Sequence, residues 1–219
     1  MKNNIYYISQ GATSDLHCRN IKQVCKIIMD NAHYNLSYVQ LRLKDVSDKE
    51  YLATAKEALE ICNFFNVKLI INDNLFVANE IACFGIHVGK NDESPISIRK
   101  KITGNKIIGG TANTLEDCLE LIKQEVDYIG LGPFKHTTTK KILSPILGME
   151  GYQFILTELK KRNLNTPIYA IGGVELEDID PLINLGFHGV AISSALTKAT
   201  SLESEDAKHT GKNERILNF

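Results

Sequence analysis

The sequence lacks the features that would place the protein in a membrane, in an oxidising compartment or on a polyanion. No apolar run approaches the roughly 18 residues that cross a bilayer, and the amino terminus has no apolar segment of signal-peptide length. The five cysteines contain no C-x-x-C pair, which favours reduced and buried thiols. The net charge of -1 provides no global field that would attract nucleic acid or anionic lipid. We therefore expect a cytoplasmic protein that binds neither nucleic acid nor membrane.

What the chain does contain is a regular alternation of short apolar runs with segments of helical spacing. The runs are rich in β-branched residues and lie near residues 4–8, 37–42, 67–71, 84–88, 106–110, 126–131, 167–171 and 187–192. Between two of them, for example, an apolar stripe at helical spacing consists of Leu52, Ala55, Leu59 and Cys62. Strands that alternate with helices imply parallel pairing through right-handed crossovers.

This alternation predicts an α/β fold, a single (β/α)8 TIM barrel with parallel strands. A doubly wound open sheet is the alternative, and the lack of a G-x-G-x-x-G motif after the first run weakens it. We expect residues 1–200 to form the barrel and catalytic domain. Residues 201–219 are polar and weakly periodic, which predicts a tail that is either a short last helix or disordered.

Cations and amides follow the second and third predicted strands. Gln40, Arg42 and Lys44 alternate along the chain, so their side chains should project to the same face. We expect that face to be the barrel interior, where desolvated cations need anionic partners. Because the carboxyl ends of all strands in such a barrel meet on one face, the sequence predicts a polyanion site there.

Two carboxylates, Asp73 and Asp92, follow the neighbouring third and fourth strands. Two oxygen ligands completed by substrate phosphates and water suit Mg²⁺. The alternative for Asp73 is that it caps the next helix. His87 lies inside an apolar run, and this position favours a hydrogen-bonded core residue over a ligand.

Small polar residues follow the last strands. Gly172-Gly173 and Ser193-Ser194 come after the seventh and eighth strands, where barrels often bind phosphate through backbone N–H groups. The alternative for the glycine pair is a tight turn without a ligand. The cationic segment 135–141 could close over a pyrophosphate or be a solvated loop. Within it, His136 has no evident partner for acid–base chemistry.

Taken together, these segments resemble the thiamine-phosphate synthase family. The resemblance runs from about residue 38 to residue 196 and is carried by the motifs Gln40-x-Arg42-x-Lys44, Ile71-Asn72-Asp73, Gly85-Ile86-His87-Val88-Gly89-x-x-Asp92, Asp127-Tyr128-Ile129-Gly130-Leu131-Gly132-Pro133, Thr137-x-Thr139-Lys140 and Ile171-Gly172-Gly173. Each motif is modest alone, but their order and spacing are specific.

The resemblance implies a transferase of thiamine biosynthesis that joins 4-amino-2-methyl-5-hydroxymethylpyrimidine diphosphate to 4-methyl-5-(2-phosphoethyl)thiazole, with Mg²⁺ as cofactor. Thiamine phosphate and pyrophosphate are the products, and the reaction is dissociative. By motif position the pyrimidine diphosphate would contact Gln40, Arg42, Lys44, Asn72 and Lys140. Mg²⁺ would bind Asp73 and Asp92, and the thiazole phosphate would contact Thr137, Thr139, Gly173, Ser193 and Ser194. The catalytic residues would be Arg42, Lys44, Lys140 and Thr111, of which Thr111 also binds substrate.

Two positions depart from the family pattern, and other functions stay open. Thr111 replaces the family's usual serine, and His136 occupies a position that is commonly proline. A thiazole tautomerase shares the fold but needs no diphosphate-and-metal site. A sugar-phosphate epimerase should show paired acid–base carboxylates or metal-binding histidines, which we do not find. A non-catalytic sensor of thiamine precursors would carry the same binding residues, and the sequence leaves the oligomeric state open.

Overall fold

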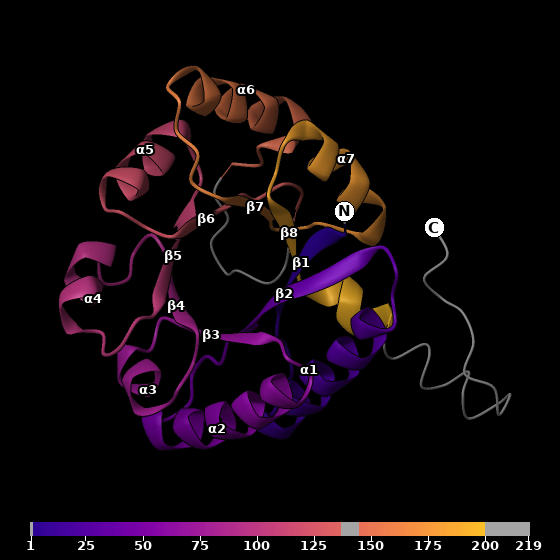
Figure 1. Cartoon of the computed structure of the whole chain (residues 1–219), viewed down its shortest axis with the longest axis vertical. Coiled ribbons are helices and arrows are strands. Elements are labelled where there is room, and N and C mark those ends of the chain that lie inside the picture. Colours follow the sequence, from indigo (N-terminus) through magenta and orange to yellow (C-terminus); the bar gives the residue numbers. More distant parts are fainter. Residues whose placement is uncertain (1, 137–144, 200–219) are drawn as a thin grey trace, which may run out of the picture.

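Eight parallel strands close into a barrel in the order in which they occur along the chain (Figure 1). The computed structural model describes residues 2–136 and 145–199. The strands are β1 (Asn3–Ile8), β2 (Tyr34–Leu41), β3 (Lys68–Asn72), β4 (Gly85–Val88), β5 (Ile107–Ala112), β6 (Tyr128–Leu131), β7 (Ile168–Ile171) and β8 (Gly189–Ile192). Pairing of β8 with β1 closes the barrel, through contacts such as Tyr6 with Ala191.

Helices surround the barrel on the outside, as Figure 1 shows. They are α1 (Ser14–Met29), α2 (Asp48–Phe64), α3 (Leu75–Glu80), α4 (Pro95–Lys101), α5 (Leu115–Lys123), α6 (Gly148–Lys161), the 3-10 helix η1 (Leu176–Asp178) and α7 (Ile179–Leu185), and residues 194–199 are also helical. Five of these helices begin at a residue whose side chain accepts a backbone N–H of the first turn: Thr13, Ser47, Asn74, Ser94 and Thr114. The short polar loops at the helix starts therefore contribute caps as well as connections.

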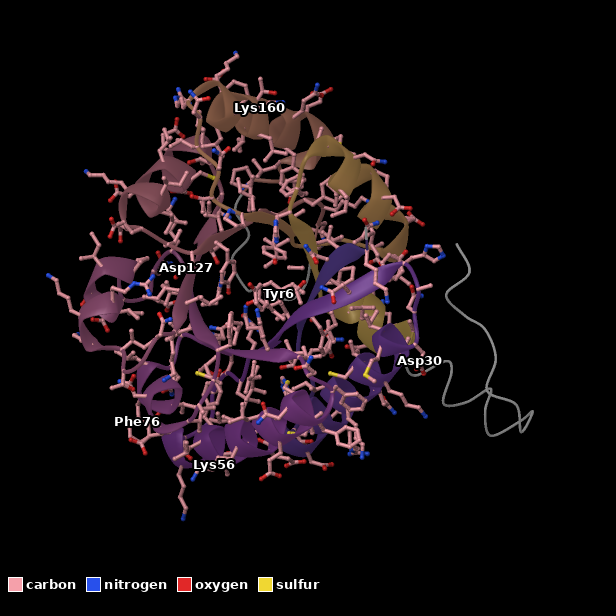
Figure 2. The ribbon with its side chains drawn as sticks, viewed as in Figure 1. Tyr6, Asp30, Lys56, Phe76, Asp127 and Lys160 are labelled. Atoms are coloured by element: carbon pink, nitrogen blue, oxygen red, sulfur yellow. The ribbon has the colours of Figure 1, made fainter. Side chains whose placement is uncertain are left out.

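The strands are buried on both faces, which explains their nearly continuous apolar sequences. One face packs against the helices in a large core. The other face fills the barrel with a smaller cluster that includes Tyr6, Ile70, Tyr128 and Tyr169. Figure 2 shows Tyr6 at the centre of the barrel. The interior below the mouth is thus a packed aromatic layer rather than a channel.

The predicted TIM barrel is confirmed, and the open-sheet alternative is wrong because the sheet closes. The predicted strands all exist, with ends that differ by up to three residues. The five cysteines are buried and free of disulfides, as expected. No helix among the described residues is long and apolar enough to cross a membrane. The predicted tail, residues 201–219, lies outside the described part of the chain.

Candidate active site

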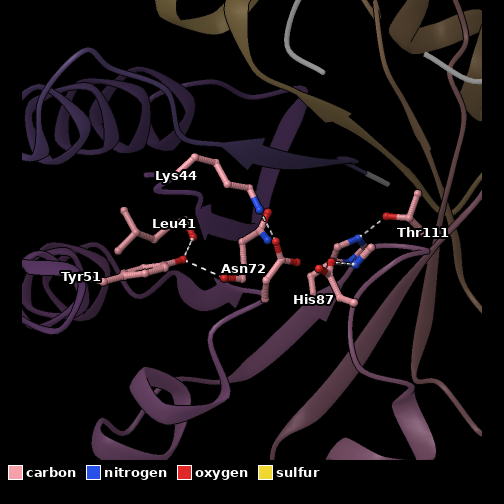
Figure 3. Close-up of polar contacts among 9 residues, drawn as sticks. Leu41, Lys44, Tyr51, Asn72, His87 and Thr111 are labelled. Atoms are coloured by element: carbon pink, nitrogen blue, oxygen red, sulfur yellow. Dashed lines mark hydrogen bonds and ion pairs between the residues drawn. The ribbon is translucent and has the colours of Figure 1, made fainter. Parts of the chain in front are cut away.

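One tyrosine on α2 joins the carboxyl ends of β2 and β3. The hydroxyl oxygen of Tyr51 lies 2.7 Å from the backbone carbonyl oxygen of Leu41 and 3.0 Å from that of Asn72, and the two carbonyls share its single hydrogen (Figure 3). The ring is 4% exposed, so these bonds are shielded from water. Each of the two carbonyls belongs to the last residue of a strand. Tyr51 therefore fixes the backbone from which Arg42 and Asp73 continue.

Two of the residues predicted for a polyanion site lie at the end of β2. Gln40 is buried, and Arg42 is half-buried directly after the strand. The backbone N–H of Arg42 donates to Ser9 Oγ at 3.1 Å, and Ser9 Oγ also lies 2.8 Å from Nδ1 of the buried His17. Burial lowers the pKa of His17, and the nearby Arg42 lowers it further. A neutral His17 is therefore the partner of Ser9 at neutral pH.

The expectation that Lys44 lies in the barrel interior is wrong. Strand β2 ends at Leu41, so the alternation of side chains does not extend to Lys44. The side chain is 47% exposed at the rim, where its ammonium group forms an ion pair with the Asp73 carboxylate (Figure 3). Lys44 is thus a cation at the edge of the mouth, already adjacent to an acidic group.

Asp73 is held in an unusual backbone conformation. Its φ of 59° lies in the left-handed region, which aspartate tolerates better than most residues. Its backbone N–H donates to the carbonyl of His87 at 2.9 Å. The alternative role as a helix cap belongs to Asn74, whose side chain accepts from the N–H of Val77 at 2.9 Å. The Asp73 carboxylate is therefore available to Lys44 and to a ligand.

Asp92 lies near enough to Asp73 for the two carboxylates to interact. The N–H of Gly89 donates to Asp92 Oδ2 at 2.7 Å and orients the carboxylate. Partial desolvation raises the pKa of Asp92, and the neighbouring Asp73 raises it further. Within the described residues, no group of three or more His, Cys, Asp or Glu side chains could hold a metal ion. A metal ion at this pair of carboxylates would need further oxygen ligands, such as water or substrate oxygens.

His87 is a core residue, as predicted, and it is bonded to a predicted site residue. It is 5% exposed, with Nε2 at 2.9 Å from Thr111 Oγ1 and Nδ1 at 3.1 Å from the hydroxyl of Tyr128. Asn72 and Thr111 are 7% exposed. Figure 3 shows His87 between Asn72 on β3 and Thr111 on β5. Buried polar groups from three neighbouring strands therefore face the same interior.

The glycine pair after β7 packs against the start of the loop that follows β6. Gly172 and Gly173 have φ values of +87° and +72°, a region that favours glycine. A β-carbon on Gly173 would lie 2.7 Å from the carbonyl oxygen of His136, too close for any side chain. The N–H of Lys135 donates to the carbonyl of Gly172 at 2.9 Å. The tight turn therefore also positions the loop after β6.

A second tyrosine repeats the arrangement of Tyr51 on the other side of the barrel. The hydroxyl oxygen of Tyr152, on α6, lies 2.8 Å from the carbonyl oxygen of Leu131 and 3.3 Å from that of Ile171, and the two carbonyls share its single hydrogen. These residues end β6 and β7. Neither tyrosine could be singled out from the sequence, because a tyrosine in an apolar helical stripe also fits a simple core position.

The remaining predicted residues lie at the end of β8 or outside the described chain. Ser193 Oγ donates to the carbonyl of Ile8 at 2.8 Å, and Ser194 is the first helical residue after β8. His136 is exposed. Three predicted site residues lie outside the described residues: Thr137, Thr139 and Lys140.

The arrangement at the mouth suits a substrate that carries several negative charges and a polar ring. Two cations and two carboxylates lie at the rim beside β2, β3 and β4, and buried amide and hydroxyl groups lie below them. The glycine turn and the serines after β7 and β8 line another part of the same face. Such groups can bind polar, negatively charged molecules.

Comparison with known proteins agrees with this geometry. The family described as thiamine monophosphate synthase matches residues 7–196. A thiamine-phosphate synthase of Flavobacterium johnsoniae is 42% identical over 199 residues, which cover 91% of both chains. Another from Flavobacterium psychrophilum is 38% identical and covers 91% of this chain and 93% of its own. The solved structure of thiamine phosphate pyrophosphorylase from Pyrococcus furiosus has a TM-score of 0.73 at 20% identity, and the match covers 94% and 96% of the two chains. The chain therefore belongs to the thiamine monophosphate synthase family.

Proposed function

We propose that this protein is a thiamine-phosphate synthase, a transferase acting on two small phosphorylated substrates. It would join 4-amino-2-methyl-5-hydroxymethylpyrimidine diphosphate to 4-methyl-5-(2-phosphoethyl)thiazole and release pyrophosphate. The observation that carries the proposal is the ion pair of Lys44 with Asp73 beside Asp92, at the same mouth as buried polar groups. Relatives up to 42% identical, named thiamine-phosphate synthase, support this reading.

The pyrimidine diphosphate would bind at the ends of β2 and β3. The amide groups of Gln40 and Asn72 are buried and can contact a polar heterocycle. Arg42 and Lys44, with Lys140 by motif position, would contact the diphosphate. Lys44 is already at the rim, so it can reach a ligand there by exchanging part of its contact with Asp73.

The thiazole phosphate would bind beside β7 and β8. Gly173 lacks a side chain where the backbone of two loops meets, and Ser193 and Ser194 bring hydroxyl groups to the same end of the barrel. Thr137 and Thr139 would add hydroxyl donors by motif position. Backbone N–H groups at such turns bind phosphate in many barrels.

The carboxylates of Asp73 and Asp92 fit Mg²⁺. The raised pKa of Asp92 reflects partial desolvation first and then the neighbouring Asp73 carboxylate, and a divalent cation beside the pair would relieve the repulsion between the two. Two carboxylates completed by substrate oxygens are a typical environment for this ion. When bound, Mg²⁺ would help to neutralise the charge of the departing pyrophosphate.

The residues fit a reaction that begins with ionisation. The bond between the pyrimidine methylene carbon and the diphosphate oxygen would break, and its electron pair would leave with pyrophosphate. The thiazole nitrogen would then donate its lone pair to the methylene cation and form the new C–N bond. Arg42 and Lys44 would stabilise the leaving group electrostatically, and Thr111 can add a hydroxyl donor. No general base at the reacting carbon is required.

One incubation separates the candidate functions. The purified protein is mixed with both substrates and Mg²⁺, and the products are followed by chromatography. We expect thiamine phosphate and pyrophosphate in equal amounts. Binding of both substrates without product would indicate a sensor. Isomerisation of the thiazole without condensation would indicate a tautomerase, and either result would refute the proposal.

A further inference from the structure

A chain of hydrogen bonds crosses the barrel below the mouth and links two predicted substrate contacts. Gln40 Nε2 lies 2.6 Å from the hydroxyl of Tyr6, which lies 2.8 Å from the hydroxyl of Tyr128. The Tyr128 hydroxyl lies 3.1 Å from Nδ1 of His87, and His87 Nε2 lies 2.9 Å from Thr111 Oγ1. These five side chains belong to β2, β1, β6, β4 and β5. Only the two end members are among the predicted substrate contacts.

The chain is shielded from water along its whole length. Its members are between 2% and 7% exposed, so each polar atom needs a protein partner. Aromatic rings enclose it: the ring of Tyr169 lies edge-on to Tyr6 at 5.5 Å and to Tyr128 at 5.8 Å between centroids. Burial raises the pKa of Tyr6 and of Tyr128 above the ordinary value, so both hydroxyls keep their hydrogens at neutral pH.

The donors and acceptors impose one direction on the chain. An amide nitrogen only donates, so Gln40 Nε2 donates to Tyr6 and the Tyr6 oxygen accepts. Among the described residues the hydrogen-bond partners of the Tyr6 hydroxyl are Gln40 and Tyr128, so we assign its hydrogen to the bond with Tyr128. With that assignment, Tyr128 accepts from Tyr6 and its own hydrogen is left to donate to His87 Nδ1, which lies 3.1 Å away.

The direction then determines the form of His87 and of Thr111. Because Nδ1 of His87 accepts a hydrogen bond, the proton of the neutral ring is on Nε2. Nε2 donates to Thr111 Oγ1, so the hydroxyl hydrogen of Thr111 is left to donate to another group. At the opposite end, one of the two hydrogens of Gln40 Nε2 is committed to Tyr6, which fixes the orientation of the amide and leaves Oε1 to accept. The two ends of the chain thus differ in polarity.

We propose that Tyr6, Tyr128 and His87 are positioning residues that make Gln40 an acceptor and Thr111 a donor toward the bound substrate. Gln40 Oε1 would accept from an N–H of a heterocycle, such as an exocyclic amine, and Thr111 would donate to an anionic oxygen. The inference rests on the proposed function, because it takes Gln40 and Thr111 as contacts of the pyrimidine diphosphate. It adds that polar recognition at both positions is set by groups that do not touch the substrate.

The imidazole nitrogens of His87 give a direct test that needs no activity. The ¹⁵N chemical shifts of the histidine rings are measured in the free protein, and the His87→Gln variant assigns the signals by their absence. We expect a protonated Nε2 and an unprotonated Nδ1. A proton on Nδ1 would reverse the chain and overturn the proposal. Because this measurement uses no substrate, its outcome is independent of whether the proposed reaction is correct.

Steady-state kinetics test the consequence for substrates, with a matched control in the same aromatic cluster. Tyr128→Phe and Tyr6→Phe each remove one hydroxyl from the chain and keep the ring. Tyr169→Phe removes a hydroxyl that is directed at Tyr38 and Ser37 instead. We expect kcat/KM for the pyrimidine diphosphate to fall tenfold or more in the first two variants and less than twofold in the control. KM for the thiazole phosphate should stay within twofold in all three.

A double variant shows whether Tyr128 acts through Thr111. Thr111→Val keeps the shape of the side chain and removes the hydroxyl. If the two residues belong to one chain, Tyr128→Phe should add less than twofold to the defect of Thr111→Val. Multiplicative defects, or equal losses in Tyr128→Phe and Tyr169→Phe, would overturn the proposal. Absence of thiamine phosphate formation by the unmodified protein would instead refute the proposed function, and the ring tautomer of His87 would still decide the direction of the chain.

Discussion

Replacing Tyr51 by phenylalanine removes the hydroxyl that donates to the carbonyls of Leu41 and Asn72 at 2.7 and 3.0 Å. The ring is 4% exposed and keeps its packing, so the change isolates the hydrogen bonding of the shared hydroxyl. Leaving buried acceptors without this donor costs about 1–3 kcal/mol of the free energy of unfolding. For a chain of this size that corresponds to a fall in Tm of roughly 2–12 °C. Thermal denaturation followed by circular dichroism measures it.

The same substitution should affect one substrate and spare the other. Arg42 and Asp73 directly follow the two carbonyls, so a looser backbone there displaces a cation and a carboxylate of the proposed diphosphate site. We expect KM for the pyrimidine diphosphate to rise about tenfold, equivalent to about 1.4 kcal/mol of binding free energy. KM for the thiazole phosphate should change less than twofold.

Tyr152→Phe is the matched control for this reasoning. It removes the equivalent donor from the carbonyls of Leu131 and Ile171. Leu131 precedes the loop after β6, and Ile171 precedes the glycine turn on which the start of that loop packs. We expect a similar fall in Tm, with KM raised for the thiazole phosphate rather than for the pyrimidine diphosphate. If both variants raise both KM values equally, or if Tyr51→Phe leaves Tm unchanged, the reasoning is refuted.

Three further substitutions test single groups of the mouth. Lys44→Ala should reduce turnover by on the order of a hundredfold, about 2.7 kcal/mol of barrier, while isothermal titration shows thiazole phosphate binding unchanged; the reverse pattern would contradict the assignment of two anion sites. Asp92→Asn should raise the Mg²⁺ concentration for half-maximal activity, and full activity of the unmodified protein in excess chelator would contradict a metal role. Gly173→Ala should lower Tm, because alanine at φ +72° costs about 1–2 kcal/mol and its β-carbon would meet His136; an unchanged Tm would contradict the close packing.

The sequence predicts the barrel and the location of its mouth because both follow from local patterns. Apolar runs alternating with helical stripes specify the parallel strands, and the residues after each run are those that the closed barrel brings together. The sequence also indicated a helix cap at this point as an alternative role for Asp73, and in the structure the cap is Asn74, one residue further along.

The rest depends on contacts between segments that are far apart in the chain. The expectation that Lys44 lies in the barrel interior was wrong because pairing with β3 determines where β2 ends. Beyond that end the side chains no longer alternate between the two faces of the sheet. The predicted stripe of α2 included Leu52 and Leu59, which are partly buried, and omitted Tyr51, whose role depends on two strand ends. Partners of His87 on β5 and β6 are likewise visible only once the strands are in register.

The Tyr128 ring occupies the space that a side chain at position 109, on the neighbouring strand β5, would need. A β-carbon on Gly109 would lie 2.1 Å from Cζ of Tyr128, so no side chain at position 109 can coexist with this ring. The two positions should therefore change together among homologues, with a larger residue at 109 accompanied by loss of the tyrosine. Relatives that keep the pair would also keep the tyrosine hydroxyl that, in our proposal, orients His87. This single pair would divide the family by mode of recognition before any activity is measured.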